Sequence, residues 1–215
     1  AGVAIADITA GMFAASASMA ALFARERTGK GQRIDMALLD SQVALLTYHA
    51  SNYLVSGDVP KRHGTDHPNI VPYQAFKARD TYFAFAAGND LQWKRFCEVA
   101  SRPGWITDER FATNSARVEN RAEVVDALNE LFSTRDAADW MELCDEAGLP
   151  SGPINTIDRV LKHPQVQARE MSVEVPHLAD GTVPLVNSPM KIPTAPTSVR
   201  YPPPVLGQHT DEILE

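Results

Sequence analysis

The chain has 215 residues, of which 44% are hydrophobic and 22% are charged. This length and composition are typical of one or two soluble globular domains and exclude a disordered chain or a small disulfide scaffold. The formal net charge of −7 argues against a protein that binds nucleic acid or an anionic membrane surface.

The first predicted element is a helix at residues 7–27, built from small residues and ended by Gly29. Nine of the twelve residues from Ala10 to Ala21 are Ala, Gly or Ser, so neighbouring elements are expected to pack closely around the helix and bury it. Residues 8–24 carry no charge, but they are too few and too weakly hydrophobic for a membrane span, which needs about 20 mainly apolar residues. No basic segment precedes them, so no secretory signal is predicted.

The next elements lead to a long loop. A short strand is expected at 33–36 and a second helix at 38–54, where apolar residues recur at helical spacing. Residues 56–72 then form a loop that holds two of the six histidines. A loop of this length without its own secondary structure is uncommon unless it is functional or a linker.

The middle of the chain predicts mixed helix and strand structure. Strand-like runs at 73–77 and 82–87 are separated by four residues and predict a hairpin. A helix at 90–99 follows, and its expected core residues are Leu91, Phe96 and Val99. The later predicted elements are helices at 120–132 with Asn120 as N-cap, at 136–147 before Gly148 and at 154–162, strands at 172–175 and 183–185, and a helical acidic end.

These elements divide the chain into an outer part and a middle part. The two ends, 1–54 and 180–215, are expected to belong to one large domain that brackets a small α+β domain at 73–165. Residues 55–72 and 166–179 connect these parts. Because the chain begins at Ala1, inside a fold-like segment, we expect it to be the latter part of a longer polypeptide.

Several common kinds of site are missing from the sequence. No CxxC, HxH or HExxH spacing occurs, so no metal site is predicted, and no GxSxG motif marks a serine nucleophile. Gly29-Lys30-Gly31 follows a helix rather than a strand, which is typical of a helix stop and not of a phosphate loop. Cys97 and Cys144 lie in amphipathic helical patterns, which indicates buried thiols in a reducing compartment.

Asp7 is the sole charged residue among the first 24, and it lies where the small-residue helix is expected to begin. Its position alone favours an N-cap, whose side chain accepts a hydrogen bond from the first turn. A second interpretation is a carboxylate nucleophile, which the helix dipole and free N–H groups would keep ionised. Such a carboxylate can attack a thioester and form a mixed anhydride.

The loop sequence from Arg62 to Asn69 also allows two interpretations. Gly64 lets backbone N–H groups approach an oxyanion, and His63 and His67 can bind a carboxylate. The alternative is a solvated linker, and composition alone favours neither.

These residues belong to a longer pattern that resembles the class III CoA-transferases, the CaiB/BaiF family. In that family an aspartate precedes a small-residue helix that ends in a motif similar to RERTGKGQ, as Asp7 and residues 25–32 do here. The mid-chain part most resembles the members that use dicarboxylates such as glutarate. The further matching strings are Leu38–Gln42, His63–Phe76, Gly88–Asn89, Gly152–Asn155 and Leu206–Thr210.

The resemblance implies an α/β fold, with part of a Rossmann-like large domain plus a small α+β domain, in subunits that interlock as a homodimer. It implies Asp7 as the catalytic nucleophile and a flexible loop that covers the reaction intermediate. CoA is a co-substrate, and no metal or other cofactor is implied. The family's CoA-binding residues precede the aspartate, so they cannot be assigned on this chain. The implied substrate-binding residues are Arg62, His63, Gly64, Thr65 and His67.

The sequence therefore predicts an enzyme that transfers CoA from an acyl-CoA to a small carboxylic acid, with dicarboxylates among the candidates. The reaction would pass through an aspartyl anhydride and an aspartyl–CoA thioester. Neither nucleic acid nor a membrane is an expected partner, and the expected location is the cytoplasm, or the mitochondrial matrix in a eukaryote. Two alternatives stay open: a 2-methylacyl-CoA racemase, in which the aspartate transfers a proton at the α-carbon, and a non-catalytic structural subunit.

Overall fold

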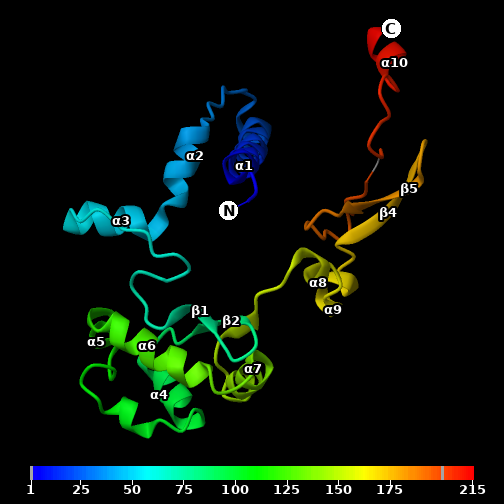
Figure 1. Cartoon of the computed structure of the whole chain (residues 1–215). Coiled ribbons are helices and arrows are strands. Elements are labelled where there is room, and N and C mark those ends of the chain that lie inside the picture. Colours follow the sequence, from blue (N-terminus) through cyan, green and yellow to red (C-terminus); the bar gives the residue numbers. More distant parts are fainter. Residues whose placement is uncertain (1, 200) are drawn as a thin grey trace. The chain divides into compact units, whose positions relative to one another are not determined.

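The computed structural model describes residues 2–199 and 201–215, and these residues combine helices with small antiparallel sheets (Figure 1). The chain forms two compact units, residues 1–64 and 65–215. The boundary between the units falls within 55–72, the segment expected to connect two domains. That both chain ends share one large domain stays a prediction.

The first unit is helical. Its helices are α1 (Ile5–Thr28), α2 (Leu38–Leu45) and α3 (Thr47–Ser56). α1 ends where the sequence predicts, because Gly29 adopts a left-handed φ of 70° and donates its N–H to the Arg25 carbonyl.

Two predictions for this unit are wrong. The expected strand at 33–36 is missing, and residues 29–37 form no regular element. A short strand needs a neighbouring strand to pair with, and the described residues offer none at this position. The expected single helix at 38–54 is interrupted at Leu46, after which Thr47 has a left-handed φ of 45°.

α1 packs through small residues. It contacts α2, and the Gln42 Nε2 approaches the Thr9 Oγ1 at 3.5 Å. The expectation of a buried helix is wrong for this chain by itself, because no residue of α1 is buried. Larger apolar side chains of α1 such as Met12 and Phe23 are 65% and 61% exposed. The half-buried residues recur at three- and four-residue spacing along one stripe: Ala6, Thr9, Ala10, Ala14, Ala17, Ala21 and Ala24.

This exposed apolar surface leads to a prediction about the chain in isolation. Residues 1–215 should bind a dye that reports exposed apolar surface, aggregate with time and show no affinity for CoA. Replacing Met12, Met19 and Phe23 together by Lys should strongly reduce dye fluorescence, since their spacing places them on one face of α1. Lysines at exposed Ser51, Asn129 and Ser133, all outside α1, serve as the control and should leave the fluorescence unchanged. A monodisperse monomer that melts cooperatively and binds no dye would contradict the prediction.

α1 also bears on the question of a membrane span. Within the described part of the chain it is long and apolar enough to cross a membrane, with 24 residues and a mean hydropathy of 1.4 over its most apolar window. The argument from length against a span therefore does not hold. The observation is weak evidence by itself, because core helices of soluble proteins and signal sequences have the same length and hydropathy.

The second unit contains a three-stranded antiparallel sheet (Figure 1). Strands β1 (Tyr73–Lys77) and β2 (Tyr82–Ala86) confirm the predicted hairpin, with Tyr73 opposite Ala86 and Lys77 opposite Tyr82. The edge strand β3 (Ser151–Pro153) pairs with β2 and is absent from the predicted elements. Its Ser-Gly-Pro sequence is typical of a turn, so local pattern could not identify it.

Helices pack against this sheet around an aromatic core. They are α4 (Asp90–Val99), the 3₁₀ helix η1 (Pro103–Ile106), α5 (Asn114–Glu119), α6 (Arg121–Phe132) and α7 (Ala137–Glu146). α4, α6 and α7 confirm predicted helices. The Phe132 ring lies 5.0–5.7 Å from five other aromatic rings, those of Phe76, Phe83, Phe85, Phe96 and Trp140.

Two details of these helices correct the predictions. Leu91 is 59% exposed, because α4 buries the face that carries Trp93 and Phe96, and a residue two positions from Trp93 points the other way. Asn120 does not cap α6 with its side chain. Its Nδ2 instead donates to the carbonyl of Ala116, in the helix that ends just before it.

The last part of the chain consists of short elements. They are α8 (Ile157–Leu161), α9 (Pro164–Ala168), β4 (Ser172–His177), β5 (Gly181–Val186) and α10 (Thr210–Leu214). β4 and β5 pair antiparallel and confirm the two predicted strands, each extended by a few residues. α10 confirms the helical acidic end.

Candidate active site

Asp7 lies in the first turn of α1, at the third helical residue. The N-cap is Ala4, which makes no side-chain cap, so the interpretation of Asp7 as an N-cap is wrong. Its side chain is exposed and has no hydrogen-bond or ion-pair partner among the described residues. The N–H groups of Ala6 and Asp7 also reach no described acceptor. The Asp7 carboxylate therefore lies at the positive end of the helix dipole, and no other described group binds it.

The first half of the loop, Gly57–Gly64, belongs to the same unit as Asp7. Gly57 ends α3 with a φ of 79°, and Gly64 has a φ of 64°, a left-handed conformation that favours glycine. The His63 ring stacks on the His49 ring of α3 with 6.2 Å between their centroids. Arg62 is exposed and forms no ion pair with any residue that the structure describes.

The second half of the loop folds back on strand β1. The Thr65 hydroxyl accepts a hydrogen bond from the Ala75 N–H, and the His67 N–H donates to the Tyr73 carbonyl. The His67 ring lies nearly parallel to the Tyr73 ring, at 9° and 5.4 Å between centroids. Residues 65–72 are therefore anchored, and the interpretation of this half as a solvated linker is wrong.

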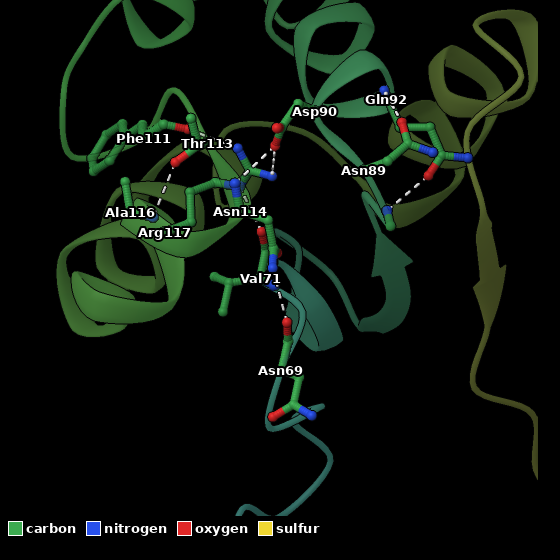
Figure 2. A network of polar contacts seen from close by, with 11 residues as sticks. Asn69, Val71, Asn89, Asp90, Gln92, Phe111, Thr113, Asn114, Ala116 and Arg117 are labelled. Carbon is green, nitrogen blue, oxygen red and sulfur yellow. Dashed lines mark hydrogen bonds and ion pairs between the residues drawn. The ribbon is translucent and has the colours of Figure 1, made fainter. Parts of the chain in front are cut away.

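Two residues of the α5–α6 region hold the same segment from the other side. Asn114 accepts a hydrogen bond from the Val71 N–H and donates one to the Asn69 carbonyl (Figure 2). The Arg121 Nη2 donates to the carbonyls of His67 and Pro68 at 2.9 and 2.7 Å.

Arg117 ties this segment to the core. Its side chain is fully buried and donates to the Val71 carbonyl, the Phe111 carbonyl and the Asp90 carboxylate (Figure 2). Its guanidinium also lies 5.0 Å from the Trp93 ring centroid. Burial lowers the pKa of Arg117, and the bond to Asp90 offsets part of that shift, so the guanidinium stays charged.

Asn114, Arg117 and Arg121 were missed by sequence reasoning. Each makes side-chain contacts that span 27 to 54 residues of chain, and no local motif marks such a partner. The sequence offers one weak signal, a charged residue, Arg117, four residues after Thr113, which is the N-cap of the short helix α5. The Arg117 backbone N–H donates to the Thr113 carbonyl. That spacing is too common to indicate burial.

The loop offers unoccupied backbone donors. The N–H groups of Gly64, Thr65 and Asp66 donate to no other residue in the described part of the chain. Consecutive free N–H groups are the donors from which an oxyanion site is built.

Three of the strings that carry the family resemblance border one concavity in the second unit. It has a volume of about 390 Å³, and Tyr73 and Gly88 line it together with Gly152 of β3. The Gly88 N–H donates to Gln92 Oε1 at 2.7 Å, and a Cβ on residue 88 would approach that oxygen to 3.3 Å. A glycine at this position therefore keeps the strand end and the first turn of α4 close together.

The cysteines do not supply a nucleophile. Burial raises the pKa of Cys97 to about 12 and that of Cys144 to about 11, so both stay neutral thiols at physiological pH. Among the residues that the structure describes, no group of three His, Cys, Asp or Glu side chains is placed to hold a metal ion.

A family model described as CoA-transferase family III matches residues 1–210 of this chain. The chain belongs to that family. It is 42% identical over its whole length to mouse succinyl-CoA:glutarate CoA-transferase and 41% identical to succinate–glutarate CoA-transferase of Agrobacterium fabrum. Acetyl-CoA:oxalate CoA-transferase of Acetobacter aceti is 34% identical over 89% of the chain.

A solved structure gives the same assignment. The crystal structure of a CaiB/BaiF family protein from Brucella suis covers 100% of this chain at 41% identity with a TM-score of 0.78. The resemblance and the mixed helix and sheet fold are thereby confirmed. The chain spans about half the length of its relatives: 49% of the mouse protein, 54% of the Agrobacterium protein and 55% of the Brucella protein.

Proposed function

We propose that the gene product containing this chain transfers CoA from an acyl-CoA thioester to a small carboxylic acid. The observation that carries the proposal is the match over the whole chain to relatives that are named CoA-transferases. The unpartnered carboxylate of Asp7 in the first turn of α1 supports it, because this chemistry needs an accessible anionic nucleophile.

In the proposed reaction the Asp7 carboxylate attacks the thioester carbonyl, and the C–S bond breaks to give a mixed anhydride and CoA thiolate. The thiolate then attacks the aspartyl carbonyl, which releases the donor acid and leaves CoA as an aspartyl thioester. The acceptor carboxylate attacks this thioester and forms a second anhydride with release of the thiolate. Attack of the thiolate on the acceptor carbonyl yields the new acyl-CoA and regenerates the Asp7 carboxylate.

The loop around Gly64 has two roles in this proposal. Its free N–H groups donate to the oxyanion that forms at each attack, and its backbone shields the anhydride from water, which would hydrolyse it. Arg62, His63, Thr65 and His67 are the substrate-binding side chains. CoA is a co-substrate, no other cofactor takes part, and the enzyme is a homodimer of interlocked subunits with a Rossmann-like large domain, in the cytoplasm or mitochondrial matrix.

The direct test uses the complete gene product with succinyl-CoA as donor and glutarate as acceptor. Formation of glutaryl-CoA and succinate in equal amounts would support the proposal. Epimerisation of a 2-methylacyl-CoA without CoA transfer would contradict it and favour proton transfer by the aspartate. Binding of CoA without any turnover would favour a non-catalytic subunit.

The cationic and hydrogen-bond-donating side chains of the loop predict a preference for dicarboxylates. One acceptor carboxylate reacts, so the other needs a partner that is cationic or donates hydrogen bonds, and Arg62 and His67 lie on either side of Gly64. An ion pair in a closed site contributes more than an exposed one. Arg62→Ala and His67→Ala should therefore each reduce kcat/KM for glutarate or succinate by about 2–3 kcal/mol in transition-state free energy. Butyrate, which has no second charge, should be nearly unaffected.

Two further variants act as controls for this comparison. His67→Phe keeps an aromatic ring to stack on Tyr73 but loses the Nδ1 that accepts the Asn69 N–H, so it separates the role of the imidazole from that of ring stacking. Arg159→Ala removes an exposed arginine of α8 and should leave both acceptors unchanged. Equal losses for glutarate and butyrate would mean that the loop serves the chemistry or the fold and does not select the acceptor.

A further inference from the structure

Arg121 is the first residue of α6, and its side chain holds the loop at a single turn. One nitrogen, Nη2, donates to two consecutive carbonyls, those of His67 and Pro68, at 2.9 and 2.7 Å. Two short bonds from one charged group to adjacent peptide units restrict both the position and the orientation of the loop backbone.

The surroundings of the Arg121 side chain indicate that it is not placed to form an ion pair. In the described chain no carboxylate lies within ion-pair distance of it, whereas Arg110 of the same unit pairs with both Asp108 and Glu123. Its Nη1 is buried and has no hydrogen-bond partner among the described residues, which is a cost to stability. The contacts that this side chain does make to the loop all go to backbone oxygens.

The clamped turn directly follows the free donors. His67 comes immediately after Gly64, Thr65 and Asp66, whose N–H groups reach no described acceptor. The Thr65 hydroxyl and the His67 N–H are themselves bound to β1. The segment is therefore held by β1 and by α6. The N–H groups of Gly64, Thr65 and Asp66 lie beside these anchors and donate to no described residue.

We propose that Arg121 is a positioning residue for CoA transfer: it fixes the turn at His67–Pro68 so that the loop preceding it keeps its N–H groups available to the reacting carbonyl and keeps water away. This inference rests on the proposed function of the chain. Arg121 touches no substrate in this role, and it acts through the loop backbone.

The fate of the anhydride provides a readout that a general loss of stability does not change. CoA thiolate attacks the anhydride to continue transfer, whereas water attacks a carbonyl carbon, breaks the C–O bond and releases the donor acid and the Asp7 carboxylate. A smaller fraction of folded enzyme lowers the rates of both reactions in proportion. A displaced loop admits water, so it raises the ratio of hydrolysis to transfer.

The test compares Arg121→Ala, Arg121→Lys and Arg110→Ala in the complete gene product, with succinyl-CoA and glutarate. In Arg121→Ala, kcat for transfer should fall about tenfold to a hundredfold, the scale of a loop displaced by about 1 Å, and the ratio of hydrolysis to transfer should rise about tenfold. KM for succinyl-CoA should change little. Arg121→Lys keeps a cationic donor and should give an intermediate ratio. Arg110→Ala removes an arginine of the same unit that contacts no part of the loop, so it should match the wild type.

An unchanged ratio in Arg121→Ala, with transfer and hydrolysis reduced equally, would overturn the inference. Hydrogen exchange tests it independently of activity. The bonded amides of His67, Asn69 and Val71 should exchange at least about tenfold faster in Arg121→Ala than in wild type or Arg110→Ala, with α6 unchanged. Equal exchange would overturn the inference even in an active enzyme. Faster exchange in a protein that transfers no CoA would refute the proposed function and leave the clamp itself supported.

Discussion

Replacing Asp7 by Asn is expected to abolish nearly all CoA transfer by the complete gene product, with a loss of several orders of magnitude in kcat. The amide has almost the same shape as the carboxylate but no charge, so it cannot attack the thioester carbonyl. Stability should change by about 1 kcal/mol or less, because Asp7 caps no N–H group and contributes only its interaction with the helix dipole.

Asp40 provides a matched control within the same unit. It occupies the third helical residue of α2, as Asp7 does in α1, and it is also exposed. Asp40→Asn should therefore cost a similar amount of stability and leave transfer intact. Incubation with acyl-CoA followed by hydroxylamine should convert the activated carboxyl to a hydroxamate, which mass spectrometry should locate at Asp7 alone. Substantial activity in Asp7→Asn, or a hydroxamate at another residue, would contradict the nucleophile assignment.

The elements that the sequence predicts well are those with their own periodicity and their own ends. In the hairpin at 73–86, β2 alternates exposed and buried residues from Tyr82 to Phe85, and α7 combines a helical apolar face with a left-handed Gly148 after its end. Asn89 caps α4 by accepting from the Gln92 N–H, at the predicted strand-to-helix junction. In each case the information lies within a few neighbouring residues.

The failures share a dependence on distant partners. Residues 33–36 have the composition of a strand but no neighbour to pair with in the described chain, and β3 has the composition of a turn but pairs with β2. α1 has the small residues of a buried helix, and the described chain covers only one stripe of it. Pattern within a window cannot supply the partner, so the outcome depends on contacts formed far along the chain.

The candidate site shows the same division. The motif resemblance identified Asp7 and the Gly64 loop as candidate functional residues, whereas composition alone left each with two interpretations. The structure removes the capping role from Asp7 and the linker role from residues 65–72. The residues that anchor the loop, Asn114 and Arg121, have no sequence signature, because their partners are backbone carbonyls and N–H groups rather than side chains. A hydrogen bond to a backbone group cannot be inferred from the residue type of the partner.

The largest loss of stability is expected for Arg117→Met, which replaces a fully buried guanidinium by an apolar side chain of similar length. The Val71 and Phe111 carbonyls would lose the charged donor that binds them, and each buried acceptor left unsatisfied costs about 1–3 kcal/mol. The ion pair with Asp90 is lost as well. We expect a decrease of about 2–6 kcal/mol in the free energy of unfolding, which comes from the two unsatisfied carbonyls, because the Asp90 side chain is 55% exposed and its carboxylate stays solvated.

The measurement is hydrogen exchange of the core amides of α4 and α6 in the complete gene product at increasing urea concentration, which reports the unfolding of this unit directly. Arg117→Lys keeps the charge but not the geometry of three separate donors, so it should lose less stability than Arg117→Met. Arg110→Met is the control: Arg110 and Glu123 are exposed and Asp108 is half-buried, so loss of these ion pairs should cost about 1 kcal/mol. Because Arg117 also binds the Val71 carbonyl at the base of the loop, Arg117→Lys should speed hydrogen exchange of the Asn69 and Val71 amides before the unit unfolds. An unfolding free energy for Arg117→Met equal to that of Arg110→Met would show that the buried guanidinium is replaceable and that the other anchors suffice to hold the loop.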